Sequence, residues 1–557
     1  MSAHDGTGSE LSLAAVHEAI GQARPDEECL VFRDRRFTWA QVEDRTRRLA
    51  NHLLAAGLGC HVERAELAGH ESGQDHLAIY LHNGNEYLET MLGALKARVA
   101  SLNVNYRYVA EELRYLLTDS NATAVVVHSA FAPTLAEVLG DLPNLRTILQ
   151  VRDDSGNELL PGAVWYEDAL ASASSDRPEV AWNADDLYLL YTGGTTGMPK
   201  GVMWRNGDAM RSCFGGSPTA RTLDEFVAGA AEGGLRALIG PPFMHGAGHW
   251  IAFRTWLSGG TVFVPSVPER LDPTDVWASI ERERLDFLLI VGDAFARPLL
   301  DELDRAAGAR DLSSLAVILS GGAALSAPLK DEFLAHLPTV MIIDGLGSSE
   351  AGGQISHVSA GGNATTGTFP LTDGNVVLSA EIDRVLDPGD DELGWLAKSG
   401  RLALGYLGDA DKTARTYPVV DGVRYAVPGD RARLLDDGLD GLGIVELHGR
   451  DSVTINSGGE KIFAEEVEAA LRSHPAIYDC IVVGRPSERW GREVVAVLRL
   501  RDGHEADDAE LLDAAQRHIA RYKLPKAIVR VDDVVRSPSG KADYRWATGI
   551  ATASERS

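Results

Sequence analysis

The sequence LYLLYTGGTTGMPKGVMWRN, residues 187–206, joins an apolar run to a loop rich in glycine and threonine. The run Leu187–Tyr191 is continuous, as in strands that are covered on both faces. In the loop, glycine N–H groups, threonine hydroxyls and the cation of Lys200 suit a phosphate group. The spacing differs from that of a P-loop, because Gly-Lys-Thr is absent. On composition alone, a polar turn between strands is the alternative.

Outside this loop, short apolar runs alternate with amphipathic stretches. Residues 78–83, 122–128 and 284–293 read as strands, and residues 86–97 read as a helix. Another helix begins after Thr38, which forms a capping box with Gln41, and it stops at Gly57. This alternation predicts an α/β fold with mostly parallel sheets and crossover helices.

Composition excludes several classes of protein. The chain is 45% hydrophobic and 24% charged, a composition that is typical of globular proteins. With 557 residues, it is too long to fold around a single hydrophobic core. A net charge of −28 argues against general nucleic-acid binding, so a polyanionic ligand needs a local group of cations. No apolar run approaches the roughly 18 residues of a membrane span, and we expect a cytoplasmic protein. The widely spaced cysteines indicate neither a metal site nor a disulfide framework: Cys29, Cys60, Cys213 and Cys480.

The composition changes at residues 436–443, DDGLDGLG, a turn-rich stretch. Beyond it the chain has its own amphipathic helices, such as residues 465–474 and 509–522, and strand-like runs. We therefore predict two domains, residues 1–449 and a small α+β domain of residues 450–557.

The loop Tyr191–Gly201 resembles the phosphate-binding signature of the acyl-adenylate-forming enzymes, which include acyl-CoA synthetases, peptide-synthetase adenylation domains and luciferases. Further stretches resemble the motifs of this family in the same order: PPFMHGAGHW (241–250), ILSGGAALS (318–326), MIIDGLGSSEAGG (341–353), YAVPGD (425–430), LHGRDSVTINSGGEKIFAEEVE (447–468) and RSPSGKADYR (536–545). The resemblance extends from about Phe37 to Arg545. It departs from the family pattern at Gly193, Leu346, Pro428 and Ser452.

The resemblance implies a nucleotide site, in which Asp430 accepts the ribose hydroxyls and Arg450 lies beside the same sugar. A capping aspartate and a surface arginine are the plainer interpretations. The implied contacts to ATP and AMP are Thr192, Gly193, Gly194, Thr195, Thr196, Gly197, Lys200, Gly322, Ala323, Ala324, Asp344, Gly345, Leu346, Gly347, Ser348, Ser349, Asp430 and Arg450.

The resemblance also implies the catalytic residues. Lys541 enters the large domain and bridges the carboxylate and the α-phosphate, where it stabilises developing charge. Thr195 and Glu350 hold Mg²⁺, a cation that prefers oxygen ligands. His245 borders the acyl tunnel as a gate, not as a general base, since adenylation removes no proton from a carboxylate. Without the resemblance, the plainer interpretation is that each of these three side chains is a solvated loop residue: Lys541, Glu350 and His245.

A mobile C-terminal domain is implied as well, with its hinge at Asp451 and Ser452. The implied acyl pocket contains His245, Gly246, Trp250, Gly321, Leu346, Gly347 and Gly353. The implied CoA tunnel contains Asn456, Ser457, Gly458 and Gly459.

We therefore expect an acyl-CoA ligase that uses ATP and Mg²⁺ to form an acyl-AMP and then a CoA thioester. The alternatives are an enzyme that loads an acyl carrier protein and a non-catalytic nucleotide-binding relative. The wording of the motifs is most similar to the actinobacterial branch that activates steroid or polycyclic terpenoid carboxylates, as in lipid or natural-product metabolism. Straight fatty acids and aryl acids stay open, as does association into homodimers.

Overall fold

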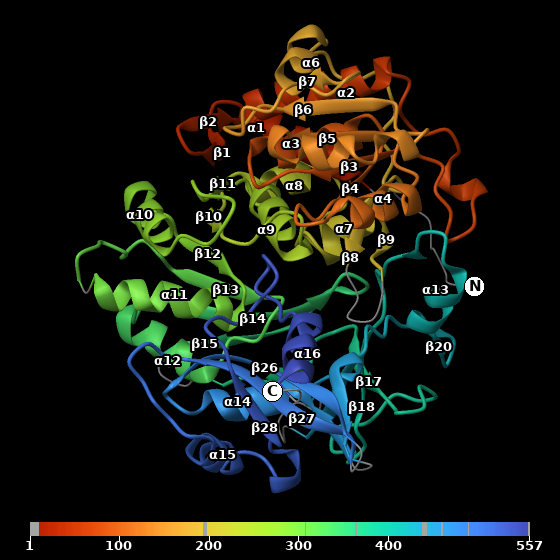
Figure 1. The fold of residues 1–557 in the computed structure, drawn as a ribbon. Coiled ribbons are helices and arrows are strands. Elements are labelled where there is room, and N and C mark those ends of the chain that lie inside the picture. The colour runs from red at the N-terminus through yellow and green to blue at the C-terminus, as the bar shows by residue number, and fades with distance from the viewer. Residues whose placement is uncertain are drawn as a thin grey trace.

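The computed structural model describes residues 11–192, 198–306, 308–361, 365–436, 443–457, 460–487 and 490–554 (Figure 1). The middle of the phosphate-loop motif, Gly193 to Gly197, lies outside the described residues, as do Gly458 and Gly459 of the expected CoA tunnel. We call residues 11–450 the large lobe and residues 454–554 the C-terminal lobe.

An eight-stranded sheet forms the centre of the large lobe, in the order β15-β14-β13-β12-β10-β11-β1-β2. Its neighbouring strands are parallel except for the β1–β2 and β14–β15 pairs at its two edges. The strands are β1 (Glu28–Phe32), β2 (Arg35–Thr38), β10 (Arg236–Ile239), β11 (Thr261–Val264), β12 (Phe287–Ile290), β13 (Val317–Gly321), β14 (Met341–Ser348) and β15 (Gly352–Ser359). The helices between them are α7 (Asn206–Ser212), α8 (Leu223–Ala230), α9 (Gly246–Leu257), α10 (Pro273–Glu283), α11 (Gly292–Arg305) and α12 (Ala327–His336).

A second, wholly parallel sheet of five strands lies at the top of Figure 1, in the order β4-β3-β5-β6-β7. Its strands are β3 (His76–Tyr80), β4 (Ala100–Asn103), β5 (Ala124–His128), β6 (Thr147–Val151) and β7 (Val164–Trp165). The helices of this part are α1 (Leu13–Ala23), α2 (Trp39–Ala55), α3 (Asn85–Lys96), α4 (Ala110–Asp119), α5 (Ala132–Ala136) and α6 (Tyr166–Ser172).

Smaller sheets complete the large lobe. Three strands, β19-β9-β8, carry the start and end of the phosphate-loop motif: β8 (Leu187–Thr192), β9 (Lys200–Arg205) and β19 (Gly405–Tyr406). Five strands in the order β16-β23-β22-β18-β17 lead to the expected hinge: β16 (Thr368–Pro370), β17 (Asn375–Leu378), β18 (Gly394–Lys398), β22 (Asp430–Leu435) and β23 (Ile444–Arg450). Between β19 and β22 in sequence lie helix α13 (Ala410–Thr416) and a hairpin of β20 (Val419–Val420) and β21 (Val423–Arg424).

The C-terminal lobe has one sheet, β25-β24-β27-β26, with β28 added beside β27. Its strands are β24 (Thr454–Ser457), β25 (Glu460–Phe463), β26 (Ile477–Ser487), β27 (Gly491–Leu500) and β28 (Ala527–Arg530). Its helices are α14 (Ala464–Arg472), α15 (Asp508–Gln516) and α16 (Tyr544–Ala553). Figure 1 shows these blue elements below the eight-stranded sheet. Where the domains divide stays a prediction.

The expected α/β fold is confirmed, and the local sequence explains its elements. Thr38 begins α2 with the predicted capping box, in which its hydroxyl accepts the Gln41 N–H and the Gln41 side chain accepts the Thr38 N–H. The strands that read as continuous apolar runs, β3, β5 and β12, are buried along nearly their whole length. Sheets covered on both faces require this pattern.

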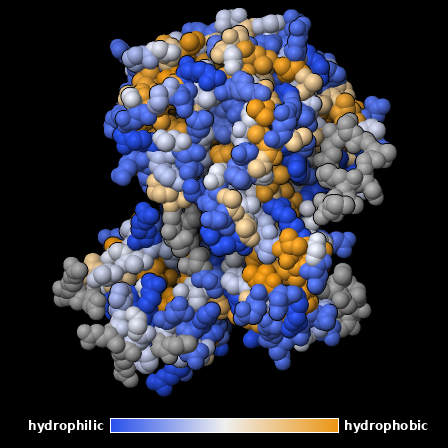
Figure 2. Space-filling view, turned by 90° about the vertical axis from the view of Figure 1, so that its right-hand side faces the viewer, coloured by the Kyte–Doolittle hydropathy of each residue, from blue (hydrophilic) through white to orange (hydrophobic). Residues whose placement is uncertain are grey.

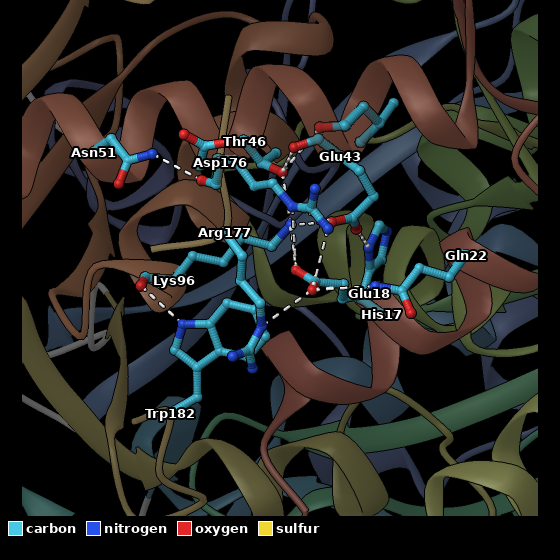
Figure 3. Close-up of polar contacts among 12 residues, drawn as sticks. His17, Glu18, Gln22, Glu43, Thr46, Asn51, Lys96, Asp176, Arg177 and Trp182 are labelled. Atoms are coloured by element: carbon cyan, nitrogen blue, oxygen red, sulfur yellow. Dashed lines mark hydrogen bonds and ion pairs between the residues drawn. The ribbon is translucent and has the colours of Figure 1, made fainter. Parts of the chain in front are cut away.

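A buried group of charged residues docks the first helix onto α2 and α3 (Figure 3). Glu43 accepts hydrogen bonds from Lys96 and from His17 Nδ1, the latter at 2.6 Å. Lys96 also donates to the Thr46 hydroxyl at 2.9 Å. Burial alone would raise the pKa of Glu43, but Lys96 and His17 lower it to about 2. A buried carboxylate is tolerated only with such partners.

In the face drawn in Figure 2, hydrophilic and hydrophobic residues are mixed, and a deep hollow separates the lower parts of the molecule. All four cysteines are free thiols. Among the described residues, none of the helices has the length and apolar character to cross a bilayer.

Candidate active site

Two of the expected site residues, Thr192 and Gly321, end strands of the large lobe. In open α/β sheets, ligands bind beyond the carboxyl ends of the strands. Asn103, the last residue of β4, donates from its amide to the carbonyls of Tyr191 (2.8 Å) and Met244 (2.7 Å). Its side-chain oxygen accepts the Tyr191 N–H at 2.8 Å. Asn103 therefore joins the end of β8, just before the phosphate loop, to the segment before His245.

The phosphate side is described at its two ends. Thr192 ends β8 and pairs with Lys200, the first residue of β9. The Lys200 ammonium lies 2.9 Å from Asp119 Oδ1, and this hydrogen bond raises the pKa of Lys200. Asp119 also accepts hydrogen bonds from the hydroxyls of Tyr115 (3.1 Å) and Tyr191 (3.0 Å). Asp119 thus fixes the lysine at the loop mouth, a contact that the sequence did not indicate.

The expected adenine side follows β13, whose last residue is Gly321. Gly322 has a φ of +90°, a backbone conformation that favours glycine, and Ala323 and Ala324 continue the turn. The turn is tied to the start of α11, because the Asp293 N–H donates to the Ala324 carbonyl at 3.2 Å.

Asp344 and its neighbours lie on β14. Asp344 forms an ion pair with Lys330, which is fully buried. Its expected contact with the nucleotide stays a prediction. At Gly347 a Cβ atom would lie 2.6 Å from the Gly352 carbonyl oxygen, so only glycine fits between β14 and β15. Ser348 accepts the Ala351 N–H at 3.0 Å and closes the turn.

The expected ribose site has an unsatisfied acceptor. Arg450 Nε donates to Asp430 Oδ1 at 3.0 Å across the β22–β23 pair. The other oxygen, Oδ2, is buried and has no hydrogen-bond partner among the described atoms. A buried carboxylate oxygen without a partner is costly, and a hydroxyl donor would satisfy it. The pair therefore suits a sugar diol.

The expected metal ligand Glu350 lies in the turn between β14 and β15. Its Oε1 accepts the Tyr406 hydroxyl at 2.7 Å, and its carbonyl accepts the Tyr417 hydroxyl at 3.2 Å. The preceding Ser349 carbonyl accepts the Trp204 indole N–H at 2.8 Å. In the described part of the chain, histidine, cysteine and acidic residues form no cluster of three that could hold a metal alone. One carboxylate fits Mg²⁺ bound mainly by phosphates and water.

The expected acyl side lies at the start of α9, with His245 as its N-cap residue. Burial, followed by the nearby charges of Lys541 and His249, lowers the pKa of His245 to about 3, so the ring is neutral. Its Nε2 is buried without a hydrogen-bond partner among the described atoms. A neutral ring agrees with a gate and not with a cationic contact.

Trp250 is held in place one turn further along α9. Its indole N–H donates to the Tyr188 hydroxyl at 2.9 Å. A Cβ atom at Gly246 would lie 3.0 Å from the Trp250 ring, so the glycine allows this close approach. Leu346, in contrast, packs against a cluster that contains Ile355 and Phe369, while Gly353 is exposed on β15.

Lys541 lies against the large lobe. Its Cε is 3.9 Å from the position of a Cβ atom at Gly322, beside the turn after β13. Loss of hydration, followed by the nearby charge of Arg450, lowers the pKa of Lys541 to about 8. Glu350 and Asp430 act in the opposite direction. Residue 541 is nevertheless partly exposed to solvent.

The remaining expected residues lie on the C-terminal side of β23. Asp451 is exposed, and its N–H donates to the Gly429 carbonyl at 3.1 Å. Ser452 belongs to the same short 3₁₀ turn, residues 451–453. Asn456 is exposed and Ser457 is buried on β24. The hinge and the tunnel stay predictions.

Sequence reasoning missed the residues that position the site. Asn83, after β3, accepts the Phe243 N–H at 2.6 Å and donates to the Pro241 carbonyl at 3.1 Å, which shapes the turn before His245. Asn83 and Asn103 follow or end parallel strands, a signal that could have pointed to them. For Asp119 and Tyr406 the sequence holds no comparable signal, because their partners are distant in the chain.

Comparison with known proteins places this geometry in a family. The chain matches the family model of the AMP-binding enzymes over residues 17–394 and that of the AMP-binding enzyme C-terminal domain over residues 466–541. It therefore belongs to the AMP-binding enzymes. The expected class of enzyme is confirmed too: the chain is an adenylate-forming acyl-CoA ligase.

Its relatives match along almost their whole length. Medium-chain acyl-CoA ligase Mig of Mycobacterium avium is 53% identical over 547 residues, 97% of this chain and 98% of the relative. The 3-oxocholest-4-en-26-oate–CoA ligase of Rhodococcus rhodochrous is 39% identical over 560 residues, 98% of this chain and 97% of the relative.

Solved structures agree in fold. Anthranilate CoA ligase AuaEII, in complex with anthranoyl-AMP, has a TM-score of 0.81 with 21% identity and covers 100% of both chains. ATP-bound MatB from Rhodopseudomonas palustris has a TM-score of 0.78 with 23% identity and covers 97% of this chain and 99% of that chain.

Proposed function

We propose that this enzyme uses ATP and Mg²⁺ to activate a hydrophobic carboxylic acid and passes the acyl group to CoA, with Lys541 as the catalytic cation. The observation that carries the proposal is the place of Lys541, 3.9 Å from a Cβ position at Gly322 and near Asp430 and Glu350. A cation at this point meets the charge that develops as the acid attacks phosphorus.

In the first step, a carboxylate oxygen attacks the α-phosphorus, the bond to the bridging oxygen breaks, and pyrophosphate leaves. Lys541 stabilises the charge on the α-phosphate, and Asp430 orients the nucleotide through its ribose hydroxyls. Lys200 lies at the mouth of the phosphate loop, where it can hold the departing phosphates. Mg²⁺, held by phosphates, Glu350 and Thr195, would neutralise charge on the triphosphate.

In the second step, the CoA sulfur attacks the acyl carbonyl carbon, AMP leaves, and the thiol proton goes to solvent or phosphate. Lys541 has to withdraw for the thiol to approach, which requires the C-terminal lobe to rotate about Asp451 and Ser452. Asn456 and Ser457 of β24 would then line the thiol tunnel. Full-length relatives that are named CoA ligases support CoA over a carrier protein.

Medium-chain fatty acids are our first candidates for the acyl group, because of the 53% identical relative. Steroid carboxylates are the second, because of the 39% identical relative. The chain carries no acidic residue at His245 to Trp250 that could clamp an α-amino group, so a free amino acid is disfavoured. Four free thiols and the use of ATP and CoA fit the cytoplasm.

A panel of acids tests the proposal. Fatty acids of graded length, steroid, diterpenoid and aryl acids, and amino acids would each be assayed for ATP–pyrophosphate exchange, and then with CoA or a carrier protein. We expect exchange that needs both the acid and Mg²⁺, thioesters with CoA, and the highest kcat/KM for fatty or steroid acids. Exchange that no acid stimulates would leave only the nucleotide-binding alternative, and transfer to the carrier protein alone would exclude CoA.

A further inference from the structure

A cavity of about 320 Å³ lies between the two lobes, beside the loop that carries Lys541. Its lining includes Arg107 and Asp293 from the large lobe and Asp479, Arg536 and Gly540 from the C-terminal lobe. Opposite charges from the two lobes therefore meet at this seam. None of these residues belongs to the reaction described above, which raises the question of what their contacts do.

Asp293 connects the expected adenine turn with the C-terminal lobe. It lies in the first turn of α11, where its Oδ1 accepts the Ser326 N–H at 2.8 Å. Its Oδ2 faces Arg472 Nε of α14 at 3.8 Å. Both side chains are largely buried, with exposed fractions of 14% for Asp293 and 17% for Arg472. A charge pair that is shielded from water acts more strongly than an exposed one.

Arg472 continues the chain of contacts toward the catalytic loop. A terminal nitrogen of its guanidinium lies 3.9 Å from Asp479 Oδ1 on β26. Asp479 in turn holds Arg536 through two hydrogen bonds of 2.7 Å, from Nε and from one terminal nitrogen. Two parallel bonds of this kind fix the orientation of a guanidinium group.

Arg536 begins the loop that ends at Lys541. It donates to the Gly540 carbonyl at 3.1 Å, and residue 536 bridges residue 542 as in an antiparallel pair. The Ser537 N–H donates to the Lys541 carbonyl at 2.9 Å and closes the turn. A Cβ atom at Gly540 would lie 3.2 Å from the Val291 carbonyl oxygen, so the turn packs against the segment before Asp293.

Arg107 holds the same loop from the other side. Its guanidinium donates to the Arg536 carbonyl at 3.3 Å, and its side chain is exposed. Arg107 of the large lobe thus contacts the lysine loop directly, and Asp293 is connected to it through a row of alternating charges.

We propose that Asp293 and Arg107 are positioning residues for the adenylation step, which hold the C-terminal lobe in the pose that places Lys541 in the site. The inference rests on the proposed function of Lys541. We call this arrangement, with Lys541 in the site of the large lobe, the lysine-in pose. Because the contacts of Asp293 and Arg107 exist in this pose, their loss should slow acyl-AMP formation and leave the thiol step intact.

The test measures the two half-reactions separately in Asp293→Asn and Arg107→Met. Asparagine keeps the size of the side chain and an oxygen for the Ser326 N–H, but it loses the charge that faces Arg472. We expect the single-turnover rate of acyl-AMP formation to fall about fivefold in each variant, the scale of one modest ion pair. Thioester formation from supplied acyl-AMP at saturating CoA should change less than about twofold. Arg107→Lys, which keeps a donor, should recover most of the rate.

Asp304→Asn is the matched control. Asp304 lies on the same helix α11, and its Oδ1 is 2.9 Å from His336 Nε2, a contact within the large lobe. We expect it to leave both half-reactions within about twofold of the wild type. Because Arg107 is exposed, its variants test the inference even if Asp293→Asn does not fold.

A pose measurement separates this inference from the proposed function. Spin labels on two exposed side chains, Val109 of the large lobe and Tyr522 of the C-terminal lobe, would report the distance between the lobes without any substrate. Asp293→Asn and Arg107→Met should lower the fraction in the lysine-in pose. An unchanged pose distribution, or equal loss of both half-reactions, overturns the inference. A wild type that adenylates no acid overturns the proposed function, while the spin-label result still decides the pose.

Discussion

At the scale of single residues, two side chains explain most of the proposed chemistry. Lys541 lies near Arg450, and loss of hydration, followed by this like charge, lowers the pKa of Lys541 to about 8. Asp430 has one buried oxygen that finds no hydrogen-bond partner in the part of the chain that the structure describes. A phosphate would compensate the charge of Lys541, and a sugar hydroxyl would donate a hydrogen bond to Asp430. A nucleotide carries both groups.

This pKa leads to a prediction for the pH dependence of adenylation. The active form of Lys541 is the cation, which is present below its pKa and lost above it. The kcat/KM for ATP in acyl-AMP formation, which reports on the free enzyme, should therefore fall as the pH rises through about 8. Arginine stays charged in this range, so Lys541→Arg should be slower overall but should lack this fall. The pH profiles of both proteins between pH 6 and 10 check this.

His245→Gln provides the control for that profile. The pKa of His245 is about 3, so its ring does not titrate in this range and its removal should leave the fall near pH 8 in place. A fall that persists in Lys541→Arg would show that another group is responsible.

At the scale of elements, the sequence predicted those parts of the fold that depend on local chemistry. The capping box at Thr38 and the continuous apolar strands β3, β5 and β12 appear in the structure as expected. The pattern at residues 509–522 predicted one helix, but α15 ends at Gln516. The chain turns there, and Ile519 and Leu524 pack into the core of the C-terminal lobe. Tertiary packing overrides helical propensity at this point.

The contacts of the charged side chains could not be predicted from the sequence. A motif gives the place of Lys200 or Asp344 in the chain but not the partner that its charge meets. Lys200 meets Asp119, which is 81 residues away, and Asp344 meets the buried Lys330. Each ion pair joins residues from two different elements, so it forms only when the whole chain folds and could not be predicted from local sequence. The middle of the phosphate loop, including Thr195, lies outside the described residues, so its expected contacts stay predictions.

The buried charges of Figure 3 give a prediction about the docking of α1 and α3 on α2. Lys96→Met keeps most of the volume but leaves Glu43 with His17 at 2.6 Å and the more distant Arg47 at 3.9 Å as its partners. Removing one member of a buried ion pair costs about 3–5 kcal/mol, because the other charge stays buried. We expect the midpoint of thermal unfolding to fall by at least about 5 °C, measured by calorimetry.

Arg47→Met is the control for this substitution. Arg47 also contacts the cluster, through Glu18 at 3.1 Å, but 23% of its side chain is exposed. Its loss should lower the midpoint by less than about 2 °C. Similar effects of the two variants would mean that the buried position of Lys96 has no special importance for stability.

At the scale of the whole molecule, the enzyme brings cations to one place on a strongly acidic chain. The net charge is −28, yet Lys541 and Arg450 lie close enough for their charges to interact, and Lys200 lies at the start of β9, at one end of the phosphate-loop motif. Lys200 and Arg450 belong to the large lobe, and Lys541 arrives with the C-terminal lobe. In the proposed mechanism, the adenylation site is complete only while Lys541 lies against the large lobe, and the expected CoA tunnel comes into use after the C-terminal lobe rotates.

The central claim is that the C-terminal lobe delivers Lys541 for adenylation and not for thioester formation. The most direct measurement compares the two half-reactions in the wild type and in Lys541→Ala, by pyrophosphate exchange and by thioester formation from supplied acyl-AMP. We predict that exchange falls by about 10²-fold or more, as when a preorganised electrostatic contact is removed, while the rate of thioester formation stays within about threefold. Equal loss in both half-reactions, or an exchange rate that is unchanged, would contradict this account.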